Sequence, residues 1–233
     1  MTIINGATAL VTGGSRGIGK ALVEALYARG ARKVYATARD PRAVTHPDAV
    51  PLALEVTDPA SVAAAVREAD DVTILVNNAG GLVRASFLDS PVEDVRREFE
   101  TNFYGPLNVT RAFVPIIERH GGGHLLTVAS ALSWAALSGS YSASKAALWS
   151  QTNSLRLDLR TRGIRVTGLH VGYVDTDMTA AVTAPKSDPR HVAELALDGV
   201  EADAFEVLAD EVSRRAKAAL AQEIAVQYPV LAG

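Results

Sequence analysis

Cysteine is absent from this chain of 233 residues. Its absence excludes disulfide bonds, thiolate nucleophiles and cysteine-ligated zinc or iron–sulfur centres. Histidine, the commonest metal ligand among side chains, occurs only five times. We therefore expect no metal site.

Long apolar runs and an excess of charge of one sign are missing as well. No apolar stretch approaches the roughly 20 residues that span a bilayer, and the formal net charge is only -3. We therefore expect neither membrane insertion nor binding to nucleic acids or anionic membranes. Residues 1–5 lack the basic and apolar regions of a signal peptide, so a cytoplasmic protein is expected.

The sequence does contain short apolar runs that alternate with longer amphipathic stretches, which is typical of repeated βαβ units. Strands are predicted at residues 7–11, 33–38, 50–55, 72–76, 125–128, 165–170 and 206–208. Helices are predicted at residues 18–29, 59–68, 92–119, 141–162, 190–199 and 210–226. With 48% apolar residues and no linker-like tract, residues 1–233 are expected to form a single α/β domain. Its core would be a seven-stranded, doubly wound parallel sheet with helices on both faces.

A glycine-rich turn at residues 12–19 lies between the first predicted strand and the first predicted helix, the context that gives such a motif weight. In a dinucleotide site Gly13, Gly17 and Gly19 would allow a tight turn, close approach of a pyrophosphate and close helix packing. The unpaired N–H groups at the start of the helix attract phosphate. An ordinary strand-to-helix turn is the alternative, but the placement favours nucleotide binding.

The end of the second predicted strand bears on which dinucleotide binds. An NAD site places a carboxylate there, whereas arginine recognises the 2′-phosphate of NADP. Ala38 occupies the expected acidic position and Arg39 follows it, while Arg16 adds a second cation inside the glycine-rich turn. Arginine can clamp a phosphate with two hydrogen bonds. Although Asp40 would favour NAD(H), the two arginines predict a preference for NADP(H).

A tyrosine and a lysine, Tyr141 and Lys145, lie four residues apart in a predicted helix. Residues at this spacing share one helical face, so the ammonium group can lie close to the phenol. At ~5 Å and an effective dielectric constant of about 20, the attraction would lower the tyrosine pKa by roughly two units. A shift of this size would suit acid–base chemistry near neutral pH. Together with a dinucleotide turn, this pair indicates hydride transfer.

Several motifs occur in the order found in one enzyme family. They are Thr12-Gly13 with Gly17-Ile18-Gly19, Asn77-Asn78-Ala79-Gly80, Asn102, Ser130, Tyr141 with Lys145, and Gly172 with Thr176. Through these residues, which span nearly the whole chain, the sequence resembles the short-chain dehydrogenase/reductase family in its compact single-domain form. The resemblance implies a Rossmann fold and a nicotinamide-dependent oxidoreductase, and it says almost nothing about the substrate.

The resemblance also implies roles for four residues. Tyr141 would exchange a proton with the substrate oxygen, Ser130 would stabilise the charge on that oxygen, and Lys145 would bind the nicotinamide ribose and lower the Tyr141 pKa. Asn102 would hold a water molecule for proton relay. The chain supports this last role, because Pro106 has no N–H with which to occupy the Asn102 carbonyl.

Contacts to the dinucleotide are expected along the whole predicted edge of the sheet. The expected residues are Gly13, Ser15, Arg16, Gly17, Ile18, Gly19, Arg39, Glu55, Val56, Asn78, Ala79, Gly80, Tyr141, Lys145, Gly172, Val174 and Thr176. For Thr176, capping of a short helix is an equally good interpretation. The helix at residues 141–162 forms subunit interfaces in the family, which implies a homodimer or homotetramer.

The sequence departs from the family pattern around the proposed catalytic serine. The interval from Ser130 to Tyr141 is a couple of residues shorter than usual, which leaves Ser133 as a rival; Ser130 is preferred because it ends a strand. Trp134 is expected to line the substrate pocket and Trp149 to pack inside the protein.

The main hypothesis is therefore an NADP(H)-dependent carbonyl reductase or alcohol dehydrogenase with a small-molecule substrate. The alternative is a binding or regulatory protein that senses the dinucleotide without catalysis. The retained Tyr141 and Lys145 favour the enzyme.

Overall fold

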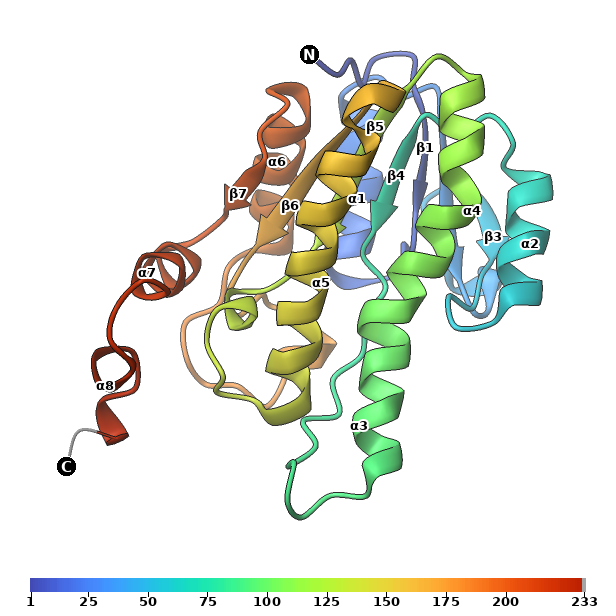
Figure 1. The fold of residues 1–233 in the computed structure, drawn as a ribbon. Helices are drawn as coiled ribbons and strands as arrows, with labels where there is room; N and C mark the ends of the chain where they lie inside the picture. The colour runs from blue at the N-terminus through green and yellow to red at the C-terminus, as the bar shows by residue number, and fades with distance from the viewer. Residues whose placement is uncertain (232–233) are drawn as a thin grey trace.

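Seven parallel strands form the centre of the computed structural model, which describes residues 1–231 (Figure 1). The strands are β1 (Thr8–Val11), β2 (Lys33–Ala38), β3 (Val50–Ala53), β4 (Ile74–Asn77), β5 (Gly123–Val128), β6 (Ile164–His170) and β7 (Glu206–Leu208). They are arranged in the order β3-β2-β1-β4-β5-β6-β7. The predicted doubly wound sheet is thus confirmed. Its strand order reverses between β1 and β4, where parallel sheets of this kind bind ligands at the carboxyl ends of the strands.

Helices cover both faces of the sheet (Figure 1). They are α1 (Gly17–Ala28), α2 (Pro59–Glu68), α3 (Val92–Phe99), α4 (Gly105–Arg119), α5 (Gly139–Leu159), α6 (Pro189–Glu201), α7 (Glu211–Ala219) and α8 (Ile224–Gln227). One apolar core lies between the sheet and α1 with α6, and a second lies between the sheet and α2, α4 and the end of α5. Between β2 and β3 the chain forms a single 3₁₀ turn, Pro41–Ala43.

Side-chain alternation along the central strands explains the two cores. On β1, Val11 packs on the α1 side and Leu10 on the α2 side; on β4, Val76 and Leu75 divide in the same way. Successive residues of a strand point to opposite faces, so a strand that is covered on both sides needs an unbroken apolar run. That requirement is why the strand positions could be read from the sequence.

The predicted helix at residues 92–119 is instead two α-helices joined by a π-helical segment, Glu100–Tyr104. The N–H of Gly105 donates to the carbonyl of Glu100, five residues earlier. The next residue, Pro106, has no N–H, so the regular α-helical ladder cannot continue through Asn102. Widened turns of this kind are frequent at functional sites, and here the turn contains the fully buried Asn102.

The predicted helix at residues 210–226 is also divided, into α7 and α8. Asp210 begins α7 through a capping box in which its carboxylate accepts a 2.7 Å hydrogen bond from the Ser213 N–H. The two short helices lead away from the end of β7 and lie beside the lower part of the fold in Figure 1.

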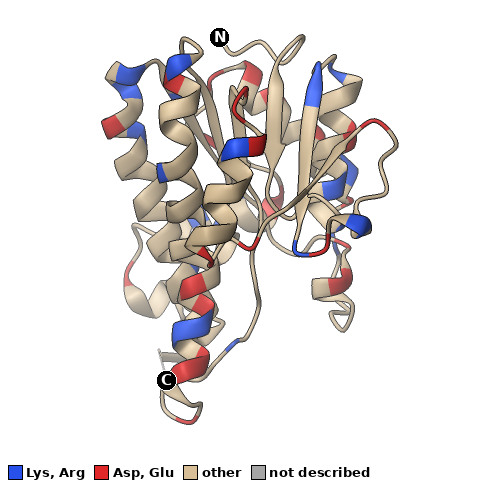
Figure 2. Ribbon diagram, turned by 90° about the vertical axis from the view of Figure 1, so that its right-hand side faces the viewer, with Lys and Arg blue, Asp and Glu red and all other residues tan. Residues whose placement is uncertain are grey.

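Charged residues of both signs are interspersed along the helices (Figure 2). This distribution agrees with the small net charge of -3 and shows no continuous basic face in that view. Over residues 1–231, no helix is both long and apolar enough to cross a membrane.

Candidate active site

The glycine-rich turn joins β1 to α1 at the carboxyl edge of the sheet. Gly13 and Gly17 have φ values of +65° and +53°, the left-handed region that favours glycine. A Cβ at Gly19 would lie 2.1 Å from the carbonyl oxygen of Gly13, so a larger residue does not fit there. No side chain caps the start of α1, which leaves its first N–H groups open to a phosphate. The turn therefore fits the pyrophosphate of a dinucleotide.

Asn78, the residue after β4, holds this turn in place. Its Nδ2 donates to the carbonyl oxygens of Thr12 and Gly13 at 2.9 and 3.2 Å. In return, Thr12 Oγ1 accepts hydrogen bonds from the N–H groups of Asn78 and Ala79, both at 2.9 Å. Asn77 is buried and donates to Thr110 at 2.8 Å instead. The structure thus brings the glycine-rich turn and residues 77–80 into direct contact.

The two arginines proposed to read the 2′-phosphate are both exposed on this edge of the sheet. Arg16 lies 3.3 Å from Asp177 in an exposed ion pair, and Arg39 follows β2. Asp40, the residue that would favour NAD(H), accepts hydrogen bonds from the backbone and side chain of Arg42 at 3.1 and 2.9 Å. These bonds lower the pKa of Asp40. Arg42 had not been identified from the sequence, although the Asp-Pro-Arg capping pattern could have indicated the pairing.

The adenine side of the predicted site follows β3. Glu55 accepts hydrogen bonds from the N–H and hydroxyl of Thr57, at 3.2 and 3.0 Å. Val56 is buried and lies against Gly105, where a Cβ would approach it to 2.7 Å. Its carbonyl accepts a 3.3 Å hydrogen bond from Asn108. Both predicted contact residues therefore lie in one short, braced loop at the same edge.

The nicotinamide side follows β6. A Cβ at Gly17 would lie 3.1 Å from Cγ2 of Thr176, which places this threonine directly on the glycine-rich turn. Thr176 also caps the short helix Asp177–Thr179, so it is at once a helix cap and a neighbour of the turn. The N–H of Gly172 donates to Asp210 at 2.7 Å, and Val174 is buried beside this segment.

Lys145 is buried next to Tyr141 on α5, as their spacing predicted. Its Nζ lies 5.8 Å from the centre of the Tyr141 ring and donates to the Val128 carbonyl at 3.1 Å. A Cβ at Gly80 would lie 3.7 Å from this nitrogen and 3.2 Å from Asn102 Oδ1. The Asn102 Nδ2 donates at 3.1 Å to the Ser144 hydroxyl on α5. The end of β4, the π-helical turn and α5 therefore meet at Lys145.

The predicted lowering of the Tyr141 pKa is not found. Burial raises the pKa of Tyr141 to about 12, and the negative charge of Glu98 adds to the effect, while a hydrogen bond with Ser130 opposes it. Burial also lowers the pKa of Lys145 to about 8. The sequence argument placed both groups in a medium of intermediate dielectric and left out the loss of hydration, which here outweighs the attraction.

Ser130 and Ser133 differ in what their hydroxyls contact. Ser130 begins the 3₁₀ turn after β5, and its Oγ accepts a 3.1 Å hydrogen bond from the Leu132 N–H. The same side chain lies within hydrogen-bonding reach of Tyr141. Ser133 is buried, and within residues 1–231 its hydroxyl has no hydrogen-bond partner. The geometry favours Ser130 as the residue that faces the reacting oxygen.

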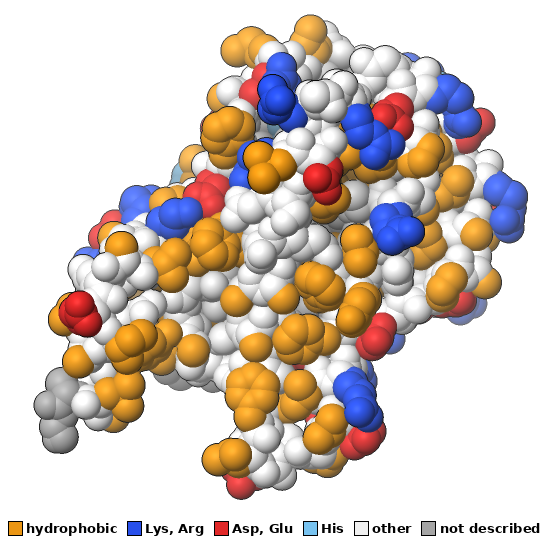
Figure 3. All heavy atoms as spheres, in the orientation of Figure 1, with side chains coloured by type: hydrophobic (Ala, Val, Ile, Leu, Met, Phe, Trp, Pro, Cys, Tyr) orange, Lys and Arg blue, Asp and Glu red, His pale blue; other side chains and the backbone are white. Residues whose placement is uncertain are grey.

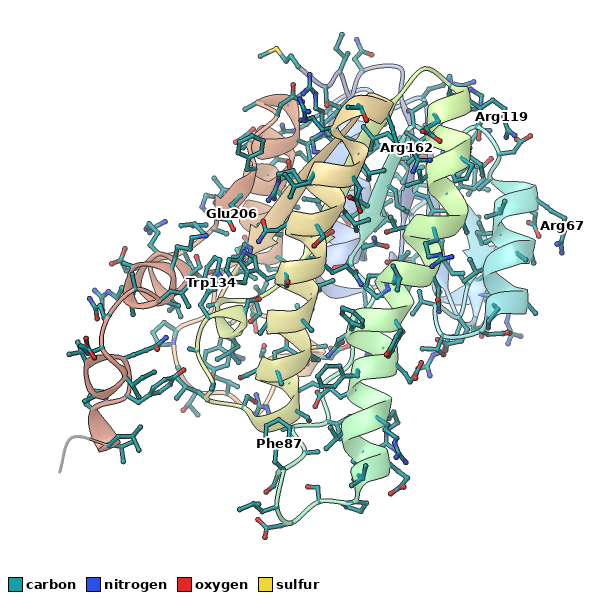
Figure 4. All side chains as sticks on the ribbon, in the orientation of Figure 1. Arg67, Phe87, Arg119, Trp134, Arg162 and Glu206 are labelled. Carbon is teal, nitrogen blue, oxygen red and sulfur yellow. The ribbon has the colours of Figure 1, made fainter. Side chains whose placement is uncertain are left out.

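The expectation that Trp134 lines a substrate pocket is wrong. Its side chain is only 3% exposed and stacks on His170 at 4.0 Å between ring centres. The Nζ of Lys217, on α7, lies over the Trp134 ring, 4.7 Å from its centre. Figure 4 shows Trp134 and Glu206 pointing into the region between α5 and α7. Trp149 donates to Glu206 at 2.9 Å in the same cluster, so the expected internal packing of Trp149 is found. The covering helix lies some 80 residues further along the chain, beyond the reach of local patterns.

Two other features bear on metal or ligand binding. Within the part of the chain that the structure describes, no three His, Asp or Glu side chains gather as a metal site would require. A cavity of about 360 Å³ opens at the amino ends of β4, β5 and β6, beside Met1 and Asp203. It lies at the opposite edge of the sheet from the glycine-rich turn and takes no part in the candidate site.

Comparisons with known proteins agree with this geometry. The family model for short chain dehydrogenases matches residues 7–187. A 3-oxoacyl-(acyl-carrier-protein) reductase of Salmonella typhimurium is 34% identical over 190 residues, which are 76% of this chain and 78% of that protein. A sorbitol dehydrogenase of Cereibacter sphaeroides is 37% identical over 197 residues, with coverage of 79% and 77%.

A solved structure shares the fold over the full length of both chains. It is a short chain dehydrogenase from Burkholderia cenocepacia in complex with NADP, with a TM-score of 0.93 and 36% sequence identity. The family model covers well over half of the chain, and the relatives exceed 30% identity over three quarters of it. The chain therefore belongs to the short-chain dehydrogenase/reductase family, whose members are nicotinamide-dependent oxidoreductases acting on CH–OH and C=O groups.

Proposed function

We propose that this protein is an NADP(H)-dependent carbonyl reductase or alcohol dehydrogenase, in which Tyr141, Ser130, Lys145 and Asn102 act on a small-molecule substrate. The observation that carries the proposal is the meeting of these four side chains next to residues 77–80, which in turn hold the glycine-rich turn. A protein that only senses the dinucleotide would have no need for a buried lysine beside a tyrosine.

The residues of the chain divide the work of binding between the two ends of the site. The turn from Gly13 to Gly19 would hold the pyrophosphate, and Lys145 and Thr176 would hold the nicotinamide end. When bound, the dinucleotide supplies the hydride. The glycines fit this task because a Cβ at Gly19 would fill the space that the loop needs.

Proton transfer is assigned to Tyr141. Because burial raises its pKa to about 12, the phenol is protonated at neutral pH and can donate to a carbonyl oxygen. The Ser130 hydroxyl would stabilise negative charge on that oxygen. Asn102 is fixed by hydrogen bonds to Gly81 at 2.8 and 3.1 Å, and its carbonyl would hold a relay water because Pro106 offers no N–H.

The choice of cofactor is assigned to Arg16 and Arg39. Both are exposed at the edge where the adenosine ribose would lie. The carboxylate of Asp40, which would favour NAD(H), instead accepts a hydrogen bond from Arg42. The NADP in the Burkholderia cenocepacia structure is in agreement. NADP(H) is therefore proposed as the preferred cofactor over NAD(H).

Replacing Arg39 with Ala should raise the Kd for NADPH about tenfold, because one charge-assisted hydrogen bond to phosphate is lost. The Kd for NADH should change less than about twofold. Fluorescence titration of both cofactors measures this difference. Arg67→Ala, at the exposed end of α2 (labelled in Figure 4), is the matched control. Tighter binding of NADH than NADPH by the unmodified protein would contradict the proposed preference.

A pair of serine variants tests which hydroxyl serves the reaction. Ser130→Ala should lower kcat about 100-fold, the loss that follows removal of one donor to a developing oxyanion. Ser133→Ala should retain turnover, because its hydroxyl contacts no reacting group. NADPH consumption over a panel of ketones, aldehydes and imines supplies the assay. The reverse order of effects would assign the role to Ser133.

Assembly into a homodimer or homotetramer is proposed through the α5 face. Figure 3 shows hydrophobic side chains gathered over the lower part of the face that carries α3, α5 and the C-terminal helices. On α5, Leu157 is 73% exposed, and Tyr104 is 44% exposed in the π-helical turn, a segment that contacts α5. In the proposed assembly, a single-domain protein in the cytoplasm would bury these exposed apolar side chains against another subunit.

A further inference from the structure

A buried carboxylate, Glu98 on α3, lies behind the proposed active site. Among the described residues it is the only buried Asp or Glu side chain, and its exposure is 0%. Charged groups are rarely found so deeply buried unless they are paired or hydrogen-bonded. None of the roles assigned above uses this residue.

Every hydrogen bond found at the Glu98 carboxyl group is one that it accepts. The donors are the N–H of Val83 at 2.7 Å, the N–H of Arg84 at 3.2 Å and the hydroxyl of Ser140. An ionised carboxyl group can only accept, whereas a protonated one must also donate. The two N–H donors suit an ionised side chain, and the Ser140 hydroxyl can donate as well, because its oxygen already accepts the Ala85 N–H.

These bonds tie the loop after β4 to the start of α5. Arg84 has a φ of +58°, a strained value for a residue with a side chain, and Glu98 accepts its N–H. Ser140 receives a hydrogen bond from the Ala85 N–H at 3.0 Å and returns one from its own N–H to the Ala85 carbonyl at 3.1 Å. Ser140 immediately precedes Tyr141. Figure 4 shows the loop, marked by Phe87, beneath the amino end of α5.

Structural anchoring does not account for the charge itself. Neutral acceptors could receive two N–H groups and a hydroxyl, and a buried charge costs more than a neutral group. Within residues 1–231, no basic side chain lies close enough to Glu98 to form an ion pair with it. The charge must therefore act at a longer distance if it has a function.

The groups within reach of that charge are those of the active site. Glu98 acts electrostatically on Tyr141 and Lys145 of α5, and Arg84 of the loop also acts on Tyr141. His170 at the end of β6 is a further titratable group that Lys145 influences. The remaining charges of α3, such as Arg97 paired with Asp94, lie on its exposed side.

We propose that Glu98 is a positioning residue whose carboxylate keeps the Lys145 side chain in its ammonium form, while its hydrogen bonds fix Ser140 and hence Tyr141. Lys145 needs such a counter-charge, because within residues 1–231 the one hydrogen bond of its Nζ goes to a neutral carbonyl, that of Val128. In agreement, the negative charge of Glu98 raises the pKa of Lys145 against the effect of burial. The proposal rests on the role proposed for Lys145.

NMR titration of the lysine ε-carbons tests the proposal without any need for turnover. The chain has five lysines, Lys20, Lys33, Lys145, Lys186 and Lys217, and a Lys145→Arg variant assigns the relevant signal. Glu98→Gln keeps the length and one acceptor oxygen but removes the charge. It should lower the titration midpoint of Lys145 by about one pH unit, because loss of an opposite charge disfavours the ammonium form.

Ser140→Ala is the matched control, because it removes a hydrogen bond to Glu98 but keeps the charge. Its Lys145 midpoint should stay within about 0.3 pH units of the unmodified protein. An unmoved midpoint in Glu98→Gln, or an equal shift in Ser140→Ala, would overturn the electrostatic role. Where the protein also reduces a carbonyl substrate, the pH at which kcat is lost should be lower in Glu98→Gln by the same amount as the Lys145 midpoint. The NMR result stands even if no substrate is turned over.

A measurement on the unmodified protein covers the case in which Glu98→Gln does not fold. The δ-carbon of Glu98 should keep the chemical shift of an ionised carboxylate throughout the pH range in which Lys145 titrates. A Glu98 side chain that is protonated at neutral pH would overturn the proposal, because it could then supply no counter-charge.

Discussion

Replacing Tyr141 with Phe should lower kcat for carbonyl reduction by about 10³-fold, the contribution typical of a positioned general acid. In the proposed mechanism the phenol donates a proton to the substrate oxygen, and at a pKa of about 12 it carries that proton at neutral pH. The Kd for NADPH should change less than about twofold, because the aromatic ring and Lys145 remain. Stopped-flow reduction and fluorescence titration measure the two quantities.

Tyr104→Phe is the matched control for this variant. Tyr104 lies in the neighbouring π-helical turn, is 44% exposed and packs edge-on against Phe103, so loss of its hydroxyl should leave kcat unchanged. Turnover by Tyr141→Phe at more than about a tenth of the unmodified rate would remove Tyr141 as the proton donor. A parallel loss of NADPH binding would instead point to a distorted site.

The architecture could be predicted from the sequence because its signals are local. Strands β2 and β7 occupy the predicted residues, and the other strands differ from prediction only at their ends. A strand covered on both faces requires consecutive apolar residues, and a dinucleotide turn requires glycine where φ is positive, as at Gly13 and Gly17. The pairing of Tyr141 with Lys145 is equally local, since it follows from helical spacing.

Features that depend on distant contacts were missed. Trp134 is buried by Lys217, and the charge of Glu98 reaches Tyr141 only because α3 packs against α5. The raised pKa of Tyr141 has the same origin, because hydration is lost through the fold as a whole and not through the residues nearby in sequence. A single proline, Pro106, does carry a local signal, because a residue without an N–H interrupts the helix as well as leaving a carbonyl free.

Acidification should destabilise the protein well above the pH at which most carboxylates are protonated. His124 and His170 are both fully buried, and burial lowers the pKa of each to about 4. In the unfolded chain both titrate near about 6.5. Between about pH 6.5 and pH 4, both histidines are therefore protonated in the unfolded state but neutral in the folded state. The free energy of unfolding consequently falls as the pH falls. The loss approaches about 3 kcal/mol for each histidine at the lower limit of this range.

Urea unfolding at about pH 7.5 and about pH 5 measures this effect. His124 is the better probe, because it lies far from the proposed active site and bonds Thr2 and Thr167, both at 2.8 Å. Asn at this position keeps polar contacts but cannot titrate, so His124→Asn should lose less stability on acidification than the unmodified protein. His191→Gln, at an exposed position, should behave like the unmodified protein. Equal stability at the two pH values would show that these histidines remain free to take up protons in the folded state, contrary to their burial.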